Sequence, residues 1–332
     1  MRDSRYKSGM GMRDRWFLTL VVMTACLAMA TVLQAGDNYK GYVNGTVFIT
    51  AAELNEIIQS KDPGLIVVAI ANAKDYHLGH IPGAVRLWRP DYEADPGTQG
   101  GVTDNIIPSE GFTKLMRSVG VNPASKVVLY DHKYDASRIW WAFYYYGKTD
   151  VRVLDGGMKA WKDAGYSTEF LPAGNRVPGT WTAKITYPAM RVDTSDILAL
   201  KDRKDAQLWD TRGDLEFCGK EIVRGAHRAG RIPWAVQADY THVKNKTNDA
   251  EWRTASEVHK TMKELGFDRR KQQYFTCQSG VRTTQWILTL YAMGWPMENL
   301  HNHDSSWIGW SMDMHLPIKT GCPDTAPAPR QK

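Results

Sequence analysis

The sequence predicts an α/β protein with two tandem domains, each a parallel sheet flanked by helices. Short apolar segments alternate with segments of helical spacing along the 332 residues, a pattern typical of parallel sheets covered by helices. Several motifs also recur in the same order in the two halves of the chain. A chain of this length suggests about two domains, and its hydrophobic content of 43% is sufficient for globular cores.

The first half supplies the clearest strands and helices. Apolar residues follow a helical spacing over 51–60 and 111–119. Short apolar runs predict strands at 66–69, 127–130 and 151–154. A further helix is expected at 138–146, where Gly147 ends the pattern.

The second half repeats this plan. A strand at 273–276 runs into Cys277, and a helix follows from 283 to 293. The matched segments are 126–147 with 273–294, 155–161 with 304–310, and 80–84 with 231–235. Three matches in the same order indicate a duplication of long period. This duplication places Asp131 at the position that Cys277 has in the second half.

The composition of the chain also suggests domain boundaries. We expect a first domain at 40–168, a linker at 169–192, a second domain at 193–318 and a flexible tail at 319–332. The linker contains Pro172, Gly174, Pro178 and Gly179, and the tail is rich in proline.

Residues 1–35 are typical of an export signal. Basic residues end at Arg15, an apolar run follows at 16–30, and cleavage after Ala30 or after Ala35 would fit the small residues there. The run is short for a membrane span, which needs roughly 20 apolar residues. The segment predicts an exported, periplasmic protein that leaves the membrane after cleavage; an uncleaved anchor is the alternative.

Charge and motifs exclude several classes of partner. The net charge is +6, and residues 1–35 contribute five basic and two acidic side chains, so half of the excess lies in that segment. No basic run is left to indicate a nucleic-acid partner. We expect no metal and no cofactor, because the His301-Asn302-His303-Asp304 cluster lacks further ligands at regular spacing and is better explained as structural.

Cys277 is the candidate nucleophile. It lies between a strand and a helix, in a loop formed by Gln278, Ser279, Gly280, Val281 and Arg282. A sulfur atom there would lie above a helix N-terminus and inside a ring of backbone N–H groups, which favours the thiolate. A buried structural cysteine is the commoner fate of a lone cysteine, but it would need neither Gly280 nor Arg282.

Cleavage of the export signal would leave an odd number of cysteines in the chain. Removal of residues 1–35 removes Cys26 and leaves Cys218, Cys277 and Cys322, so at least one thiol is free. We expect Cys277 to be free. For Cys218 and Cys322 we expect two unpaired thiols, with a disulfide between them as the alternative.

From about Asn44 to Pro317 the chain resembles the tandem-domain rhodanese family of sulfurtransferases. The segments that carry the resemblance are 80–84, 138–161, 210–219, 277–282 and 304–310. The resemblance implies that Cys277 takes the outer sulfur of a donor, holds it as a persulfide and passes it to an acceptor. It also implies donor-binding roles for Arg212 and Arg228, and Arg282 adds a positive charge within the loop.

The same resemblance implies a catalytically inactive first domain. Asp131 cannot form a persulfide, and Ala71 stands at the position of Arg212. His80 is expected to make structural hydrogen bonds. Within the second half, Arg231 and Trp234 depart from the family pattern, in a structural loop.

The sequence leaves donor and acceptor open. Thiosulfate is favoured as a small anionic donor, because Arg282 places charge where a sulfonate would lie and because an exported protein lacks a ready supply of mercaptopyruvate. A 3-mercaptopyruvate sulfurtransferase is the alternative, since Ser279-Gly280-Val281 resembles that branch. The acceptor could be cyanide, a small thiol or a thioredoxin-like protein, and a monomer is expected.

Two other functional classes use a cysteine loop of this kind. Cysteine phosphatases place their arginine six positions after the cysteine, whereas Arg282 follows Cys277 by five, so a phosphatase is disfavoured. A non-enzymatic sulfur carrier or sulfur-sensing module would use the same loop. Slow release to generic acceptors with fast transfer to one protein partner would indicate the carrier.

Overall fold

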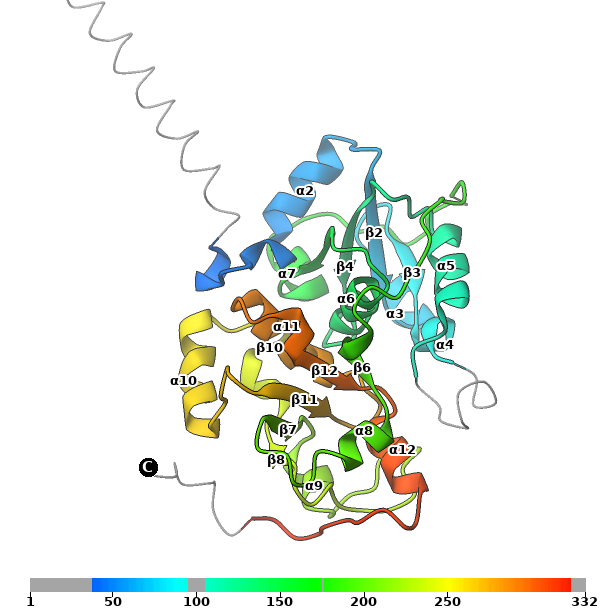
Figure 1. Cartoon of the computed structure of the whole chain (residues 1–332). Helices are drawn as coiled ribbons and strands as arrows, with labels where there is room; N and C mark the ends of the chain where they lie inside the picture. Colours follow the sequence, from blue (N-terminus) through cyan, green and yellow to red (C-terminus); the bar gives the residue numbers. More distant parts are fainter. Residues whose placement is uncertain (1–37, 95–104, 175, 324–332) are drawn as a thin grey trace, which may run out of the picture.

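The computed structural model describes residues 38–94, 105–174 and 176–323. Each half contains a five-stranded parallel sheet (Figure 1). The first sheet has the order β1-β5-β4-β2-β3, with β1 at Phe48–Ile49, β2 at Leu65–Ile70, β3 at Val85–Leu87, β4 at Lys126–Tyr130 and β5 at Val151–Leu154. The second has the order β6-β12-β11-β7-β8, with β6 at Arg191–Val192, β7 at Ala206–Asp210, β8 at Val236–Gln237, β11 at Gln272–Thr276 and β12 at Leu300–His303. The predicted fold class is confirmed.

Helices connect and cover these strands. In the first half they are α2 (Ala51–Gln59), α3 (Ala73–His77), α4 (Arg89–Tyr92), α5 (Ser109–Ser118), α6 (Ala136–Tyr145) and α7 (Gly157–Asp163). In the second half they are α8 (Thr194–Leu198), α9 (Asp214–Phe217), α10 (Ala255–Leu265), α11 (Thr283–Ala292) and α12 (Ser306–Met312). Short 3-10 turns are η1 (Tyr39–Gly41), η2 (Gly45–Val47), η3 (Pro188–Met190), η4 (Tyr240–Val243) and η5 (Met297–Asn299). No helix in the described ranges is long and apolar enough to cross a membrane.

The two sheets are equivalent strand by strand. β4 and β11 are the middle strands, and each leads through a loop into a buried helix, α6 or α11. Parallel strands covered on both faces are apolar along their whole length, as Val127–Tyr130 illustrates. Asp131 and Cys277 therefore follow equivalent strands, as the duplication predicted. Ligands of such sheets bind at this carboxyl edge.

The helices α6 and α11 lie between the two sheets and join the halves into one core (Figure 1). Every residue of α6 is buried, because the helix is apolar on nearly all sides and has protein on each of them. The ring of Tyr291 on α11 packs against Trp140 and Tyr144 at centroid distances of 5.7 and 5.3 Å. The loop that carries Cys277 opens α11, so it lies at this junction.

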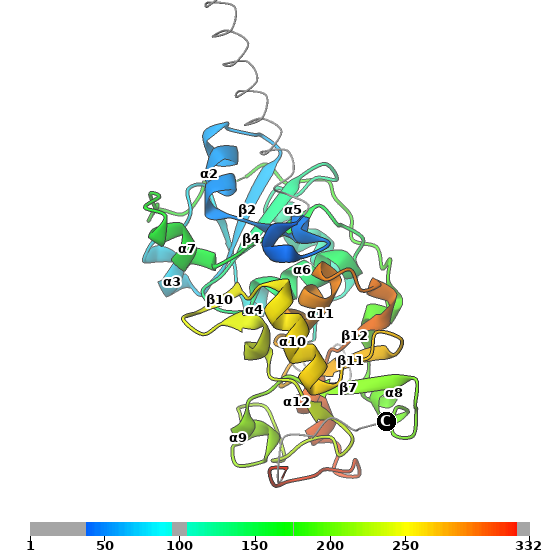
Figure 2. The same ribbon diagram turned by 90° about the vertical axis from the view of Figure 1, so that its left-hand side faces the viewer.

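A hairpin of the second half packs against the first half. It consists of β9 (Lys244–Asn245) and β10 (Asn248–Trp252), which are antiparallel. Gly156 N donates to Ala250 O at 3.1 Å, and Trp252 N donates to the Asp155 carboxylate at 2.7 Å. Figure 2 shows β10 below α7, consistent with these contacts. The sequence of this hairpin is polar and does not predict a strand.

The hairpin places a lysine beside the loop of the first half that corresponds to the Cys277 loop. The Asp131 carboxylate accepts hydrogen bonds from Lys133 N at 3.1 Å and Ala136 N at 2.5 Å. Burial raises the pKa of Asp131 to about 6, although the nearby positive charge of Lys244 opposes this shift. Burial lowers the pKa of Lys244 to about 7, against the attraction of Asp131 and Asp155. A carboxylate of the chain itself thus occupies the N–H groups of this first loop.

Replacement of Lys244 by methionine should remove a pH dependence of stability. Because the pKa of Lys244 lies near 7 in the folded protein, the unfolded state binds more protons between about pH 7 and pH 10. The free energy of unfolding should therefore rise over this window, by up to about 1.4 kcal/mol per pH unit. Urea unfolding at pH 7, 8 and 9 should show this rise for the natural protein only. Equal slopes for both proteins would contradict the assignment.

Three sequence-based expectations need correction. Cys218 and Cys322, expected to be unpaired, form a disulfide, because the chain returns to α9 and brings their Cα atoms to 4.6 Å. The start of the tail, expected to be flexible, is held by hydrogen bonds between Lys319 and Arg231. Residues 191–192, assigned to the linker, form β6 and pair with β12. The expected signal peptide lies outside the described residues.

Candidate functional site

Cys277 lies at the carboxyl end of β11, with 1% of its surface exposed. It is the free cysteine of the described part of the chain. Its backbone N–H donates to Ser306 Oγ at 3.0 Å, and the same oxygen lies 3.9 Å from the Cys277 sulfur. Ser306 therefore fixes both the backbone and the surroundings of the thiol.

Gly280 makes the tight loop after Cys277 possible. Its φ is +69°, and a Cβ at this position would lie 2.5 Å from the carbonyl oxygen of Asp304. Both the backbone conformation and the space therefore favour glycine. Gly280 N donates to Ser306 Oγ at 3.0 Å, which holds the loop closed over the end of β11.

In the described structure, the loop after Cys277 contains several backbone N–H groups without a backbone partner. Ser306 accepts those of Cys277 and Gly280. Among the described residues, no acceptor is found for the N–H groups of Gln278, Ser279, Val281 and Arg282. Free N–H groups in a loop at the start of a helix can stabilise an anion there, such as a thiolate.

Arg282 closes the loop and is bound by a carboxylate. Its Nη1 and Nη2 donate to the two carboxylate oxygens of Glu216 at 2.6 and 2.8 Å. Burial disfavours the guanidinium charge, but the hydrogen bonds to Glu216 and the attraction of Cys277 and Glu216 raise the pKa of Arg282 above its ordinary value. Arg282 thus belongs to the loop of the candidate nucleophile, and its charge is compensated by Glu216. The sequence gave no sign of this pair.

The other two arginines expected to bind a donor are engaged with the protein. Arg212 is 1% exposed, donates to both oxygens of Asp210 and to Gly230 O, and lies over the ring of Trp307 at 4.7 Å. Arg228 donates to four backbone carbonyl oxygens in the segment 310–316, at the end of α12. The geometry gives both side chains a structural role, and donor binding by either stays a prediction.

The first half holds the Cys277 loop from the other side. Arg138 on α6 donates to Gly280 O at 3.2 Å and to Asp304 at 2.5 Å. Asp304 also accepts from Arg191 Nε at 2.8 Å and from Ile106 N at 3.2 Å. Burial opposes ionisation of Asp304, but Arg138 and Arg191 hold its pKa below the usual value. Arg138 and Asp304 both belong to repeated motifs, yet nothing in the motifs indicated that they meet.

The histidines that the sequence motifs contain, His80, His301 and His303, lie in structural positions. His80 stacks on Tyr76 at 3.9 Å, and its Nδ1 lies 3.1 Å from Tyr76 O. His301 lies between Ala189 O and the Gln272 side chain, at 2.6 and 2.7 Å. Burial lowers the pKa of His303 to about 3, so this ring is neutral near pH 7.

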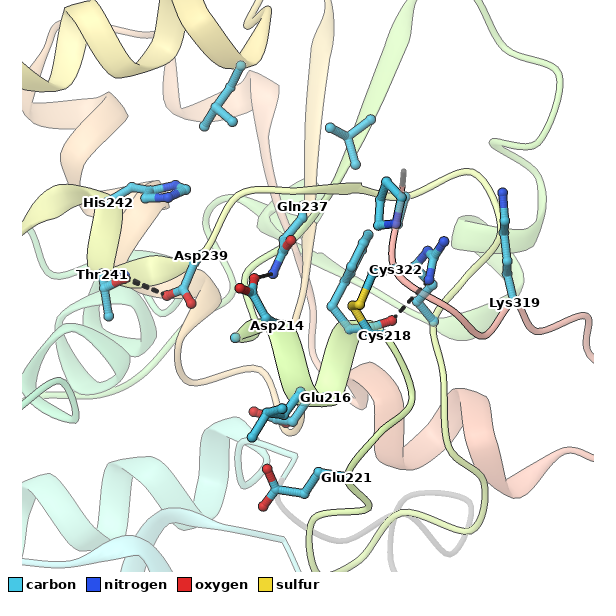
Figure 3. A pocket seen from close by; sticks show the side chains of 18 of the residues that line it. Asp214, Glu216, Cys218, Glu221, Gln237, Asp239, Thr241, His242, Lys319 and Cys322 are labelled. Atoms are coloured by element: carbon cyan, nitrogen blue, oxygen red, sulfur yellow. Dashed lines mark hydrogen bonds between the residues drawn. A yellow bond between two sulfur atoms is a disulfide. The ribbon is translucent and has the colours of Figure 1, made fainter. Parts of the chain in front are cut away.

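One cavity along the described chain includes Glu216 in its lining and does not include Cys277. It measures about 970 Å³ and is lined by α9, by β8 and by the tail with its disulfide (Figure 3). Glu216 lines this cavity as well as binding Arg282, so it stands between the cavity and the Cys277 loop. Glu221 lines the same cavity and is exposed.

Comparison with known proteins gives consistent matches over both halves. The family model described as "Rhodanese-like domain" matches residues 50–164 and 193–313. The thiosulfate sulfurtransferase of Corynebacterium glutamicum is 30% identical over 316 residues, which cover 88% of this chain and 97% of the relative. The sulfur carrier protein TtuD of Thermus thermophilus is 29% identical over 297 residues, which cover 85% of this chain and 99% of that protein.

Solved structures show the same likeness. The anaerobic ergothioneine biosynthesis enzyme from Chlorobium limicola, in complex with trimethyl histidine, superimposes with a TM-score of 0.74 and 25% identity. The match covers 85% of this chain and 72% of that enzyme. A variant of EanB, with ergothioneine linked to a cysteine persulfide, superimposes with the same TM-score over 84% of this chain and 71% of that variant.

Proposed function

We propose that this chain, which belongs to the rhodanese-like family, is a sulfurtransferase in which Cys277 carries the transferred sulfur. The observation that carries the proposal is the single free thiol of the described chain, buried at the carboxyl end of β11 and directly before the loop that opens α11. Relatives named as a thiosulfate sulfurtransferase and as a sulfur carrier support it. A structural neighbour with a cysteine persulfide supports it too.

The reaction divides into two displacement steps. With thiosulfate as donor, the Cys277 thiolate attacks the outer sulfur, an S–S bond forms, and sulfite leaves with the electron pair of the broken S–S bond. The resulting persulfide anion is held by the loop N–H groups, which remain in place in both steps. An acceptor nucleophile then attacks the outer sulfur, and the Cys277 thiolate is regenerated.

We take thiosulfate as the donor and cyanide or a thiol as the acceptor. Arg282 lies beside the thiol and can approach a sulfonate, and several relatives are named for thiosulfate. The alternative donor, 3-mercaptopyruvate, would place a carboxylate in the same region. We further propose that the protein acts as an exported, periplasmic monomer after loss of residues 1–35.

Intact mass tests the proposal directly. The purified protein is exposed to thiosulfate, then to cyanide, and its mass is measured after each step alongside thiocyanate release. We expect a gain of one sulfur that disappears with cyanide. Repetition with 3-mercaptopyruvate ranks the two donors. No gain with either donor would contradict sulfur transfer through Cys277.

Replacement of Arg282 by alanine should weaken donor binding selectively. The change removes a positive charge beside Cys277 and leaves Glu216 without its partner, so the KM for thiosulfate should rise at least tenfold, or about 1.4 kcal/mol. Alkylation of Cys277 by uncharged iodoacetamide should change less. An unaltered KM would exclude this role for Arg282.

A sulfur carrier is the second candidate, favoured by the relationship to TtuD and by the 1% exposure of Cys277. A carrier would load a sulfur as described but release it slowly to cyanide and small thiols. Rapid release to one protein partner would identify it. Equal rates to cyanide and to proteins would favour the enzyme.

A further inference from the structure

The positive charge beside the candidate nucleophile is already bound. Both terminal nitrogens of Arg282 donate to Glu216, at 2.6 and 2.8 Å. Their side chains are 15% and 11% exposed, so water and salt screen the pair only weakly. A donor that approaches Cys277 therefore meets a neutral pair, in which the two N–H groups that match an oxyanion are occupied.

Glu216 reaches this position from outside the loop. It lies on α9, next to Phe217 and two residues before the disulfide-bonded Cys218. The disulfide ties the end of α9 to the tail, which holds the backbone of this segment in place. The Glu216 side chain also lines the cavity of about 970 Å³ (Figure 3). The carboxylate thus has space to leave Arg282 by rotation of its side chain, without movement of α9.

We propose that Glu216 sets the donor selectivity of the Cys277 site by competing with anionic donors for Arg282. The inference rests on the proposed function, in which a small donor delivers sulfur to Cys277. Two effects act in the same direction. Glu216 occupies the N–H groups that would bind the donor, and its charge repels a donor of the same sign.

The second effect scales with the charge of the donor. Coulomb repulsion is proportional to the product of the charges, so the dianion thiosulfate is disfavoured more than a monoanionic thiosulfonate. An uncharged reagent is not disfavoured at all. Glu216 thereby sets the KM for thiosulfate without contacting the sulfur atom that is transferred.

The substitution Glu216→Gln separates charge from shape. It keeps the size of the side chain and one acceptor oxygen for Arg282. The KM for thiosulfate should fall about tenfold, equivalent to about 1.4 kcal/mol, with kcat unchanged within about twofold. The KM for methanethiosulfonate, which carries half the charge, should fall only about threefold, because the logarithm of the change is halved.

A second measurement does not depend on sulfur transfer. Iodoacetate and iodoacetamide alkylate the same thiol and differ mainly in charge. In Glu216→Gln the rate ratio of iodoacetate to iodoacetamide should rise about threefold, as expected for a monoanion. Glu221→Gln is the matched control, because Glu221 lines the same cavity but has no contact with Arg282 among the described residues. It should leave the ratio and both KM values unchanged.

The outcomes are distinguishable. The proposal would be overturned if Glu216→Gln accelerated iodoacetate and iodoacetamide equally, so that their rate ratio stayed constant. It would also be overturned if the ratio changed equally in Glu221→Gln. If Glu216→Gln does not fold, Glu216→Asp, with a shorter reach to Arg282, should give a smaller shift of the same sign. A shifted ratio in a protein that transfers no sulfur would support the role of Glu216 and refute the proposed function.

Discussion

Replacement of Cys277 by serine is expected to abolish sulfur loading and transfer with every donor. A hydroxyl at this position is protonated near neutral pH and does not attack a sulfane sulfur, so no persulfide forms. The loss should exceed a thousandfold in kcat/KM, or more than about 4 kcal/mol in the transition state. The measurement is thiocyanate release from thiosulfate and cyanide, with intact mass as the second readout.

The fold should survive this change. Serine is close in size to cysteine, and the shorter contact of Cys277 with Ser306, at 3.0 Å, involves the backbone N–H that serine keeps. Ser279→Ala is the matched control, because Ser279 lies in the same loop and does not carry the sulfur. Substantial transfer by the serine variant would place the sulfur-carrying group elsewhere.

Replacement of Asp304 by alanine should cause the largest loss of stability. This carboxylate is fully buried and pairs with Arg138 and Arg191, which come from the first half and from β6. Its removal takes away the buried carboxylate that both arginines share at the junction of the halves. Breaking a buried ion pair in this way costs about 3–5 kcal/mol, which guanidinium-induced unfolding should detect.

The surface offers a matched control for Asp304. Asp163 pairs with Lys159 one helical turn away, and both side chains are more than half exposed. Asp163→Ala should change the free energy of unfolding by less than about 0.5 kcal/mol. The Asp304 variant should also load sulfur slowly, because Arg138 then no longer fixes Gly280 O. A loss below about 1 kcal/mol would show that Arg138 and Arg191 find other partners.

Local features of the sequence predicted the framework of the molecule. The alternation of β2, β4 and β5 with α2 and α5 follows from apolar periodicity, which is a property of neighbouring residues. The position of Cys277 at a strand end and the need for Gly280 could be derived in the same way. The repeat added the equivalence of Asp131 and Cys277, and the order of the two sheets confirms it.

Contacts between distant residues could not be derived. Glu216 and Arg282 are 66 residues apart, Arg138 and Asp304 are 166 apart, and the two disulfide cysteines are 104 apart. All of these residues except Cys322 were visible within a motif, but a motif does not state which side chains are in contact. The assignment of Arg212 and Arg228 to donor binding came from resemblance. The structure shows the partners that each guanidinium already has.

The disulfide between Cys218 and Cys322 also protects the sulfur that Cys277 would carry. A persulfide is consumed by any thiolate within reach, through exchange that ends in a mixed disulfide. Cys218 lies close in sequence to Glu216, which contacts the loop through Arg282, and its thiol is withdrawn by the bond to Cys322. In the described part of the chain no second thiol then competes for the bound sulfur. A sulfur atom carried by Cys277 would therefore stay bound until an acceptor from outside the molecule reaches it.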